Sequence, residues 1–183
     1  MVSPGALAQN HQHIFAVRMD PAIDGTENTV LVEESHPVPF SPDRNPAGNF
    51  YEVKQTPILT STGLDAAPEH NRVIKIVNPS KKNPTSGKPV GYKFTPAPTQ
   101  KLLAQPGSVQ ANRAKFTQHH VWVTKYREGE LFAAGRYTLQ SREERGGVSD
   151  AVGRREGVDG VDLVVWNVFG LTHNPRVEDW PVM

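Results

Sequence analysis

Asn10-His11-Gln12-His13-Ile14-Phe15-Ala16-Val17-Arg18 is the segment that says most about the fold of this chain. Its distant partner is Asp162-Leu163-Val164-Val165-Trp166-Asn167-Val168-Phe169-Gly170-Leu171-Thr172-His173. Both stretches are rich in the β-branched and aromatic residues that favour strands. Residues i and i+2 of a strand project from the same face, so His11 and His13 share a face. A sheet can bring His173 alongside this pair, although it lies near the other end of the chain.

Three histidines arranged in this way are suited to a transition metal. Neutral imidazoles bind copper or zinc and leave coordination positions open for water or dioxygen. A His-x-His in a strand is by itself a weak signal, because cupins, hydrolases and ordinary core strands also contain it. The residues around the histidines must therefore decide which kind of site this is.

Composition narrows the class of protein. The 183 residues can bury the core of one ordinary domain, and 37% of them are hydrophobic. The net charge of +1 gives no field that attracts nucleic acid or an anionic membrane. No apolar run approaches the roughly 20 residues that cross a bilayer, and the first residues do not form a secretory signal. The absence of cysteine excludes thiolate metal sites and favours an intracellular compartment.

Short extended runs separated by turn residues dominate the chain. The candidate strands are His11–Asp20, Thr29–Glu34, Tyr51–Thr56, Arg72–Val77, Gly91–Pro96, His119–Lys125, Phe132–Leu139 and Val161–Thr172. Sixteen prolines and fifteen glycines are difficult to place in a helical protein. We therefore predict a mainly β fold, a sandwich of antiparallel sheets.

The segments between the strands have their own expected structures. Asn78–Pro89 is rich in proline and polar residues and predicts a turn or an exposed hairpin tip. Ala111–Gln118 is the best helix candidate, and a short turn is expected around Lys101–Ala104. The charged, glycine-rich segment Glu143–Glu156 is expected to be an exposed loop.

The two ends of the chain suggest an internal piece of a larger protein. A candidate metal strand begins soon after Met1, and the chain ends at Pro181-Val182-Met183, shortly after the second one. Natural domains rarely place their most constrained chemistry at both termini. We therefore expect residues 1–183 to form one partial domain that is truncated at both ends.

The residues around the histidines resemble those of the copper-containing amine oxidases, which carry a quinone cofactor. Asn10–Phe15, followed by Arg18-Met19-Asp20 and Ile23-Asp24-Gly25, resembles the copper-ligand segment of that family, and Val165–Met183 resembles its third-ligand segment almost residue for residue. Three shorter segments between them also resemble the family and follow in the family's order: Lys75–Pro79, Gly87–Tyr92 and His119–Thr124. The resemblance spans essentially the whole chain and implies part of the large antiparallel β-sandwich of the C-terminal catalytic domain.

The resemblance also implies two metal sites. His11, His13 and His173 match the three copper ligands of the family. The family has a second cation site of carboxylates and backbone carbonyls, and this resemblance assigns it Asp20, Pro21, Asp162 and Leu163, with calcium or manganese as the ion. Some members have a further aspartate at the position of Ala22. Without the resemblance, Asp20 and Asp162 are ordinary strand-end carboxylates that accept backbone hydrogen bonds.

The cofactor tyrosine and the catalytic aspartate of the family have no match in this chain. The family makes its topaquinone from a tyrosine in an Asn-Tyr-acid context upstream of the His-x-His. Tyr51, Tyr92, Tyr126 and Tyr137 all lie downstream of it. No residue is therefore assigned as the cofactor precursor or the proton-abstracting base, and this chain alone is expected to be inactive.

The remaining candidate side chains have simpler interpretations. His119 and His120 are adjacent at the start of a predicted strand, so they should point to opposite faces. His36 and His70 lie beside a proline and in a polar loop. All four are expected to be structural or exposed. Glu178 and Asp179 are expected to form a local salt-bridge network with Arg176 rather than to act in catalysis.

The resemblance implies the copper-binding portion of a primary amine oxidase, which converts primary amines and dioxygen to aldehyde, ammonia and hydrogen peroxide. It further implies a homodimer with hairpin arms, for which the turn around Lys81–Gly87 is a candidate, and allows a peroxisomal location.

Two alternative functions stay open. One is a truncated, non-catalytic copper-binding module. The other is a cupin-like dioxygenase, which is disfavoured because cupin ligands fall within a shorter stretch and include a nearby glutamate.

Overall fold

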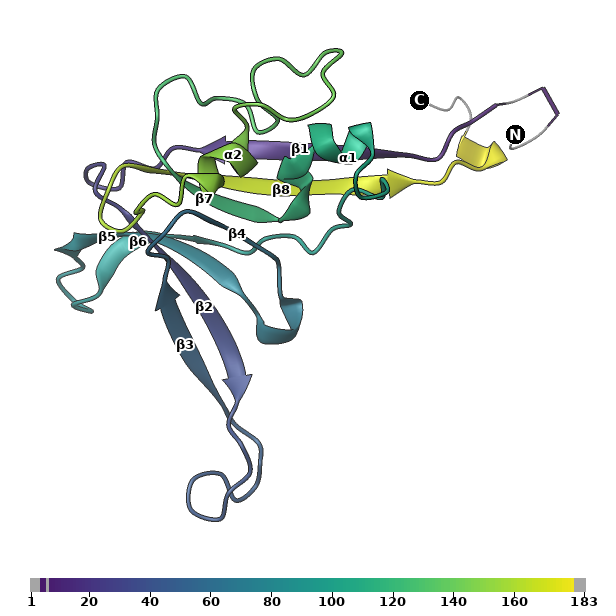
Figure 1. Ribbon diagram of the computed structural model, residues 1–183. Coiled ribbons are helices and arrows are strands. Elements are labelled where there is room, and N and C mark those ends of the chain that lie inside the picture. Colours follow the sequence, from purple (N-terminus) through teal and green to yellow (C-terminus); the bar gives the residue numbers. More distant parts are fainter. Residues whose placement is uncertain (1–3, 6, 180–183) are drawn as a thin grey trace.

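Two four-stranded antiparallel sheets form the frame of the computed structural model, which describes residues 4–5 and 7–179. One sheet has the strand order β1-β8-β7-β4 and the other has the order β3-β2-β5-β6 (Figure 1). The strands are β1 His11–Met19, β2 Thr29–Pro37, β3 Tyr51–Pro57, β4 Thr62–Leu64, β5 Val73–Lys82, β6 Pro89–Phe94, β7 Val121–Lys125 and β8 Leu163–His173. Residues 180–183, which end the segment that resembles the third-ligand segment, lie outside the described residues.

Short helices lie in the connections. They are the α-helices α1 Val109–Arg113 and α2 Val148–Gly153, and the 3₁₀ helices η1 Pro68–His70, η2 Lys115–Gln118 and η3 Val177–Asp179. In the described residues, no helix has the length and apolar character needed to span a bilayer.

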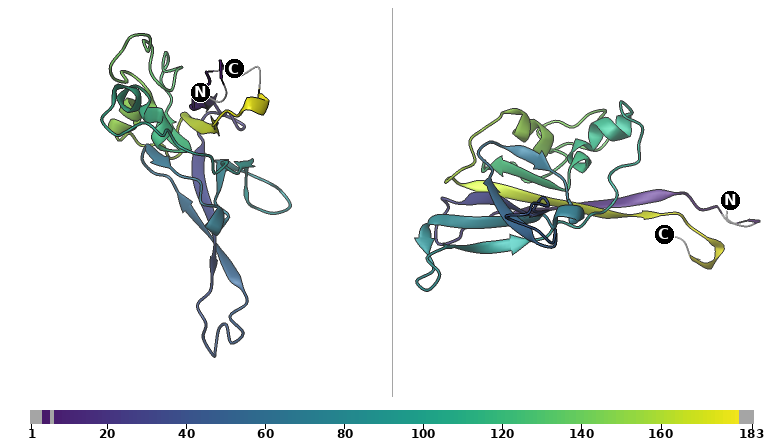
Figure 2. Two further views of the ribbon diagram at one scale, coloured as in Figure 1. Left: turned by 90° about the vertical axis from the view of Figure 1, so that its right-hand side faces the viewer. Right: turned by 90° about the horizontal axis from the view of Figure 1, so that it is seen from below.

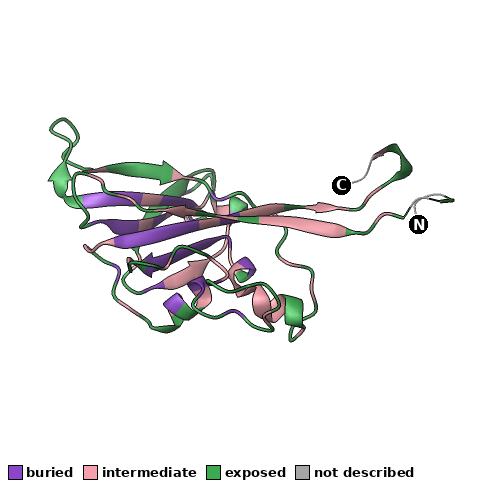
Figure 3. Ribbon diagram, turned by 90° about the horizontal axis from the view of Figure 1, so that it is seen from above, coloured by how far each residue is buried: buried purple, intermediate pink, exposed green. Residues whose placement is uncertain are grey.

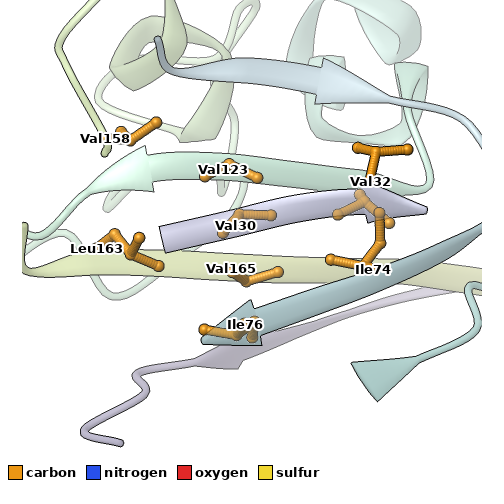
Figure 4. Close-up of a cluster of buried hydrophobic side chains, with 9 residues drawn as sticks. Val30, Val32, Ile74, Ile76, Val123, Val158, Leu163 and Val165 are labelled. Atoms are coloured by element: carbon orange, nitrogen blue, oxygen red, sulfur yellow. The ribbon is translucent and has the colours of Figure 1, made fainter. Parts of the chain in front are cut away.

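The main core lies between the two sheets. Its members come from β2 and β5 on one side and from β7 and β8 on the other: Val30, Val32, Ile74, Ile76, Val121, Val123, Leu163 and Val165, together with Val158 (Figure 4). Alternate residues of each strand face this layer, as expected for half-buried pleated strands. The predicted mainly β, antiparallel sandwich is confirmed.

The other face of the β7–β8 pair is also covered. Trp122, Val164, Trp166 and Val168 form a second buried cluster, to which α2 contributes Val148. Strand β8 is therefore buried on both faces over its first half, which explains its nearly continuous apolar sequence. The expected exposed loop over Glu143–Glu156 is wrong in its centre, because α2 forms there and packs its apolar residues onto the tryptophans.

Several other elements also differ from the prediction. The strand expected over Phe132–Leu139 is wrong. Phe132 and Leu139 are exposed, and Gly135 has a φ of +87°, with so little room that a Cβ would lie 2.0 Å from the carbonyl oxygen of Arg145. The predicted helix is split into α1 and η2, and β5 continues to Lys82 before the turn. Strand β4 was not predicted, because three residues carry too little pattern.

Two parts of the molecule project from the sandwich. The β2–β3 hairpin extends away from the core (Figure 1), and every residue of β3 is exposed. The outer part of the β1–β8 pair extends in another direction as a two-stranded ribbon, since β7 pairs with β8 only from Leu163 to Asn167. Beyond this ribbon lie the described segments next to the two ends of the chain (Figure 2), and most residues of its outer part are partly buried (Figure 3). We refer to His11–Ala16 and Val168–His173 as the outer ribbon.

Candidate metal centre

The outer ribbon brings together the three histidines that the sequence singled out. His11 and His173 are directly opposite each other in the antiparallel register of β1 and β8. His13 lies two residues along β1 and therefore projects from the same face as His11. The ring centroid of His11 is 4.9 Å from that of His13 and 4.9 Å from that of His173, and both ring pairs are edge-to-face. Rings bound to one ion through metal–nitrogen bonds of about 2.0 Å have centroids at a comparable separation of roughly 5 Å.

Hydrogen bonds set the tautomer of two of these rings. His11 Nδ1 donates to the carbonyl oxygen of Gln9 at 2.8 Å, so its Nε2 carries the lone pair. That Nε2 is buried, and no atom of the described residues forms a hydrogen bond with it. His173 Nε2 donates to Asp179 Oδ2 at 3.4 Å, which leaves Nδ1 of this ring unprotonated. Metal-binding histidines have this arrangement, in which one nitrogen donates to an oxygen and the other is free for the ion.

Asp179 contacts the His173 ring, whereas the sequence predicted only an ion pair with Arg176 for it. Its carboxylate accepts from the backbone N–H of Arg176 at 2.8 Å and from the Arg176 guanidinium at 3.4 Å. The expected network is present for Asp179, which also contacts His173, whereas none of the ion pairs among the described residues involves Glu178. The Arg176 N–H and the His173 ring lower the pKa of Asp179, so the carboxylate remains an acceptor at neutral pH. The sequence signal that could have predicted this contact is an acidic residue that follows His173 closely, after the turn at Asn174-Pro175.

The donor set fits copper or zinc better than it fits a hard cation, because all three groups are imidazoles. In the described part of the chain, no three His, Asp or Glu side chains have ligand atoms converged as they would be around a bound ion. The centre is therefore a cluster of adjacent rings in which His11 Nε2 is already buried and free of protein partners.

The residues expected to hold a second cation lie at the opposite end of the same ladder. Asp20 and Pro21 follow the last paired rung, Met19–Val165, while Asp162 and Leu163 precede it on β8. The ladder of nine residue pairs, at roughly 3.3 Å per residue, places the two ends roughly 25 Å apart. The register thus brings the four residues to one end of the strand pair.

The carboxylates at this second location have different environments. Asp162 Oδ1 is buried without a hydrogen-bond partner, which is the state expected of an oxygen that a cation would coordinate. Asp20 is half-exposed, and its Oδ2 accepts from the Arg18 guanidinium at 3.0 Å. Arg18 also lies over the Tyr126 ring, 5.5 Å from its centroid. A cation that used both carboxylates would therefore share Asp20 with Arg18.

The remaining histidines have structural contacts, with one difference from expectation. His119 Nδ1 and His120 Nδ1 lie 3.2 and 3.3 Å from the same oxygen, Asp65 Oδ1. They do not point to opposite faces, because β7 begins only at Val121 and both precede it. The rings of His36 and His70 pack with centroids 4.7 Å apart.

The four tyrosines of this chain lie in different parts of the fold. Tyr51 on β3, Tyr92 on β6 and Tyr137 in the segment before α2 are strongly exposed. Tyr126 packs under Arg18, at the end of the ladder that lies away from the histidines. These positions give no reason to assign the quinone to a residue of this chain.

Comparison with known proteins gives consistent matches along the full chain. The family model described as "Copper amine oxidase, enzyme domain" matches residues 1–183. Copper amine oxidase 1 of Aspergillus niger is 67% identical over 183 residues, which are 100% of this chain and 27% of that protein. Histamine oxidase of Arthrobacter globiformis is 42% identical over 185 residues, which cover 100% of this chain and 26% of that protein.

A solved structure supports the same relationship. The crystal structure of a copper-containing benzylamine oxidase from Hansenula polymorpha matches with a TM-score of 0.90 and 41% identity, covering 96% of this chain and 28% of that chain. The chain thus spans about a quarter of the length of the relatives it matches. It belongs to the copper amine oxidase family.

Proposed function

We propose that residues 1–183 form the copper-binding portion of a primary amine oxidase. The parent protein would oxidise primary amines to aldehydes with dioxygen as the oxidant, and would release ammonia and hydrogen peroxide. The observation that carries this proposal is the buried, unpartnered Nε2 of His11 beside two further histidine rings. Family membership supports the choice of copper over zinc.

In this proposal, His11, His13 and His173 are the copper ligands. When bound, copper supplies the one-electron redox chemistry that supports quinone formation from tyrosine and the reduction of dioxygen. The chain's own part is to present lone pairs. The Gln9 carbonyl holds a proton on His11 Nδ1, and Asp179 holds one on His173 Nε2. Each contact fixes the plane of a ring and keeps the other nitrogen free for the ion.

The quinone and the proton-abstracting base would come from parts of the parent that are not matched here. Relatives are roughly four times as long as the segment they share with this chain, and none of the four tyrosines lies in the expected context. We therefore infer that residues 1–183 are a partial catalytic domain without turnover of their own.

We further propose a calcium or manganese site formed by the carboxylates of Asp20 and Asp162 and the carbonyl groups of Pro21 and Leu163. The buried, unpartnered Oδ1 of Asp162 supports this assignment, and hard oxygen ligands suit these ions. The absence of a carboxylate at Ala22 predicts weaker binding than in relatives that have one there.

The parent is proposed to be a homodimer. The projecting β2–β3 hairpin supports this, because its exposed apolar side chains, such as Phe40 and Tyr51, have no cover within the sandwich. The turn around Lys81–Gly87 is the sequence-based candidate for an arm. It is only the short tip of the β5–β6 hairpin, so β2–β3 is the better candidate.

The alternative function is a non-catalytic copper-binding module, and one experiment separates the two. Hydrogen peroxide formation from a primary amine such as benzylamine should be measured for the copper-loaded full-length parent, for its His173→Ala variant and for residues 1–183 alone. We expect peroxide from the parent and none from the other two. A parent that binds copper but turns over no primary amine would favour the module, and peroxide from residues 1–183 alone would contradict the partial-domain assignment.

A further inference from the structure

Gln12 lies between two of the candidate ligands and makes three hydrogen bonds on the opposite side of β1. Its Nε2 donates to Thr172 Oγ1 at 2.9 Å and to the Lys101 carbonyl at 3.1 Å, and its Oε1 accepts from the Leu103 N–H at 2.8 Å. The Lys101 carbonyl can only accept and the Leu103 N–H can only donate, so the amide orientation is fixed by its partners. Gln12 is partly buried, and both ends of its amide take part in hydrogen bonds.

These bonds act where the ladder is least supported. His11 and His173 form the outermost pair of β1 and β8, in a part of the ribbon where no third strand of the described residues pairs with them (Figure 3). Strand ends open locally at low cost in free energy, and an isolated two-stranded ribbon is marginally stable in water. The Gln12–Thr172 bond crosses the ribbon at the rung adjacent to His11–His173 and opposes this opening.

The other two bonds tie the ribbon to the extended segment Thr95–Leu103, which we call the strap. The strap runs from the end of β6 across the back of the ribbon. Thr99 Oγ1 accepts from the Gly170 N–H of β8 at 3.1 Å, and the Thr99 carbonyl accepts from His120 Nε2 at 2.8 Å. The strap thus contacts β8 through Thr99 and β1 through Gln12.

The strap is itself held to the sandwich by an ionic cluster. Lys101 Nζ donates to Asp65 Oδ2 at 2.7 Å, and the other carboxylate oxygen of Asp65 lies beside His119 and His120. Asp65 directly follows β4, and His120 directly precedes β7. A continuous set of contacts therefore connects the body of the sheet, through the strap, to the rung that bears two of the histidines.

We propose that Gln12 is a positioning residue of the metal centre, which fixes the relative placement of His11, His13 and His173 by binding the strap and β8 from behind. The inference rests on the proposed copper site. Metal binding demands ligand placement within about 0.5 Å, and loss of contacts outside the ligand set typically costs about 10–100-fold in metal affinity. Removing the Gln12 amide should therefore weaken copper binding without removing any ligand.

The test is Gln12→Met, which keeps the side-chain length and removes all three hydrogen bonds. Gln100→Met is the matched control, because Gln100 is an exposed glutamine of the same strap. Copper affinity is measured by chelator competition, ligand geometry by electron paramagnetic resonance, and folding of the metal-free chain by circular dichroism. We expect Gln12→Met to bind copper at least about tenfold more weakly, with altered nitrogen hyperfine coupling, while Gln100→Met matches wild type.

A second variant keeps the test decisive if Gln12→Met does not fold. Thr172→Val removes only the cross-ribbon bond and should give a smaller loss of affinity in the same direction. If Gln12→Met folds and binds copper with the affinity and nitrogen coupling of wild type, the proposed role of Gln12 is wrong. If Gln12→Met does not fold, the same result for Thr172→Val has the same consequence. Neither result affects the three-histidine site itself. A wild-type chain without a nitrogen-coordinated copper signal would overturn the three-histidine site, and the role of Gln12 with it.

Discussion

His11 would lower the stability of a protein that does not bind a metal. Its Nε2 is buried without a partner, and an unsatisfied buried polar group costs roughly 1–3 kcal/mol. An ordinary core histidine would have both nitrogens bonded, as in His120, whose Nε2 donates to the Thr99 carbonyl and whose Nδ1 accepts from the Ala66 N–H. The cost is recovered if an ion takes up the lone pair.

This cost leads to a prediction for His11→Leu. The variant should leave the stability of the metal-free chain unchanged or raise it, because it removes a buried polar atom. It should also abolish the stabilisation by copper, which for wild type amounts to about 2.7 kcal/mol at a copper concentration of 100 Kd. Thermal unfolding with and without copper measures both effects. A copper-dependent rise in Tm that survives in His11→Leu would contradict the assignment.

Asp179 gives a second prediction at this scale. Asp179→Ala removes the acceptor that orients the His173 ring and should weaken copper binding about 10–100-fold. Glu178→Ala is the control, since it removes the neighbouring carboxylate. Isothermal titration with copper measures the difference, and equal affinities for the two variants would show that the contact to His173 does not position the ligand.

The sequence predicted the identity of the three clustered histidines but not the groups that orient them. The Gln9 partner is a backbone carbonyl, which has no signature in the sequence. The Asp179 contact depends on the turn after His173, and the three contacts of Gln12 depend on where the strap lies. The sequence did not predict the shared contact of His119 and His120 with Asp65, because their strand begins at Val121, two residues later than expected.

At the scale of elements, the strands with a strong pattern were predicted and the weak ones were not. Strand β8 is apolar on both faces because the sandwich core covers one side and α2 with its neighbours covers the other. Helix α2 was taken for a loop because its few apolar residues gain their burial from Trp122 and Trp166, which are distant in sequence. In Phe132–Leu139, the large side chains Phe132 and Leu139 remain exposed, and only the small Ala133 packs against the cluster of Trp122 and Trp166.

Glu144 connects these elements and predicts a dependence of stability on pH. Its carboxylate accepts from the backbone N–H groups of Phe116 in η2 and Ser149 in α2, each at 3.1 Å. Burial raises its pKa from the usual 4.5 to about 7, with the nearby charge of Asp150 acting in the same direction and Lys115 against it. Between these two pH values the folded chain binds more protons than the unfolded chain.

The sign of this linkage gives the third prediction. The free energy of unfolding should decrease as pH rises from about 4.5 to about 7 and level off above that. Glu144→Gln should lose this decrease, because it cannot ionise. Urea unfolding on either side of the window measures the effect. If the free energy of unfolding of Glu144→Gln depends on pH as that of wild type does, other titrating groups cause the dependence.

At the scale of the whole molecule, the sandwich has a well-packed centre and two projecting parts with exposed apolar side chains. On the histidine face of the outer ribbon, Phe15 and Leu171 are 52% and 53% exposed. Strand β3 is exposed along its full length and forms the edge of its sheet. Open edges of this kind favour association between chains.

The fourth prediction follows from that edge. Residues 1–183 should self-associate in a concentration-dependent manner, and Val53→Lys on β3 should raise the fraction of monomer, because a charge on an edge strand opposes pairing. Thr85→Lys in the turn between β5 and β6 adds the same charge elsewhere and should have little effect. Sedimentation velocity measures the association of wild type, Val53→Lys and Thr85→Lys. Equal association of all three would show that the edge of β3 is not the contact between chains.

In the proposed metal centre, His11, His13 and His173 together bind one copper ion. Copper titration followed by electron paramagnetic resonance, on wild type and on His173→Ala, tests it most directly. We predict one nitrogen-coordinated Cu(II) signal per chain in wild type, and a weaker signal with altered nitrogen coupling in His173→Ala. A nitrogen-coordinated signal that is identical in the two proteins would contradict the three-histidine site.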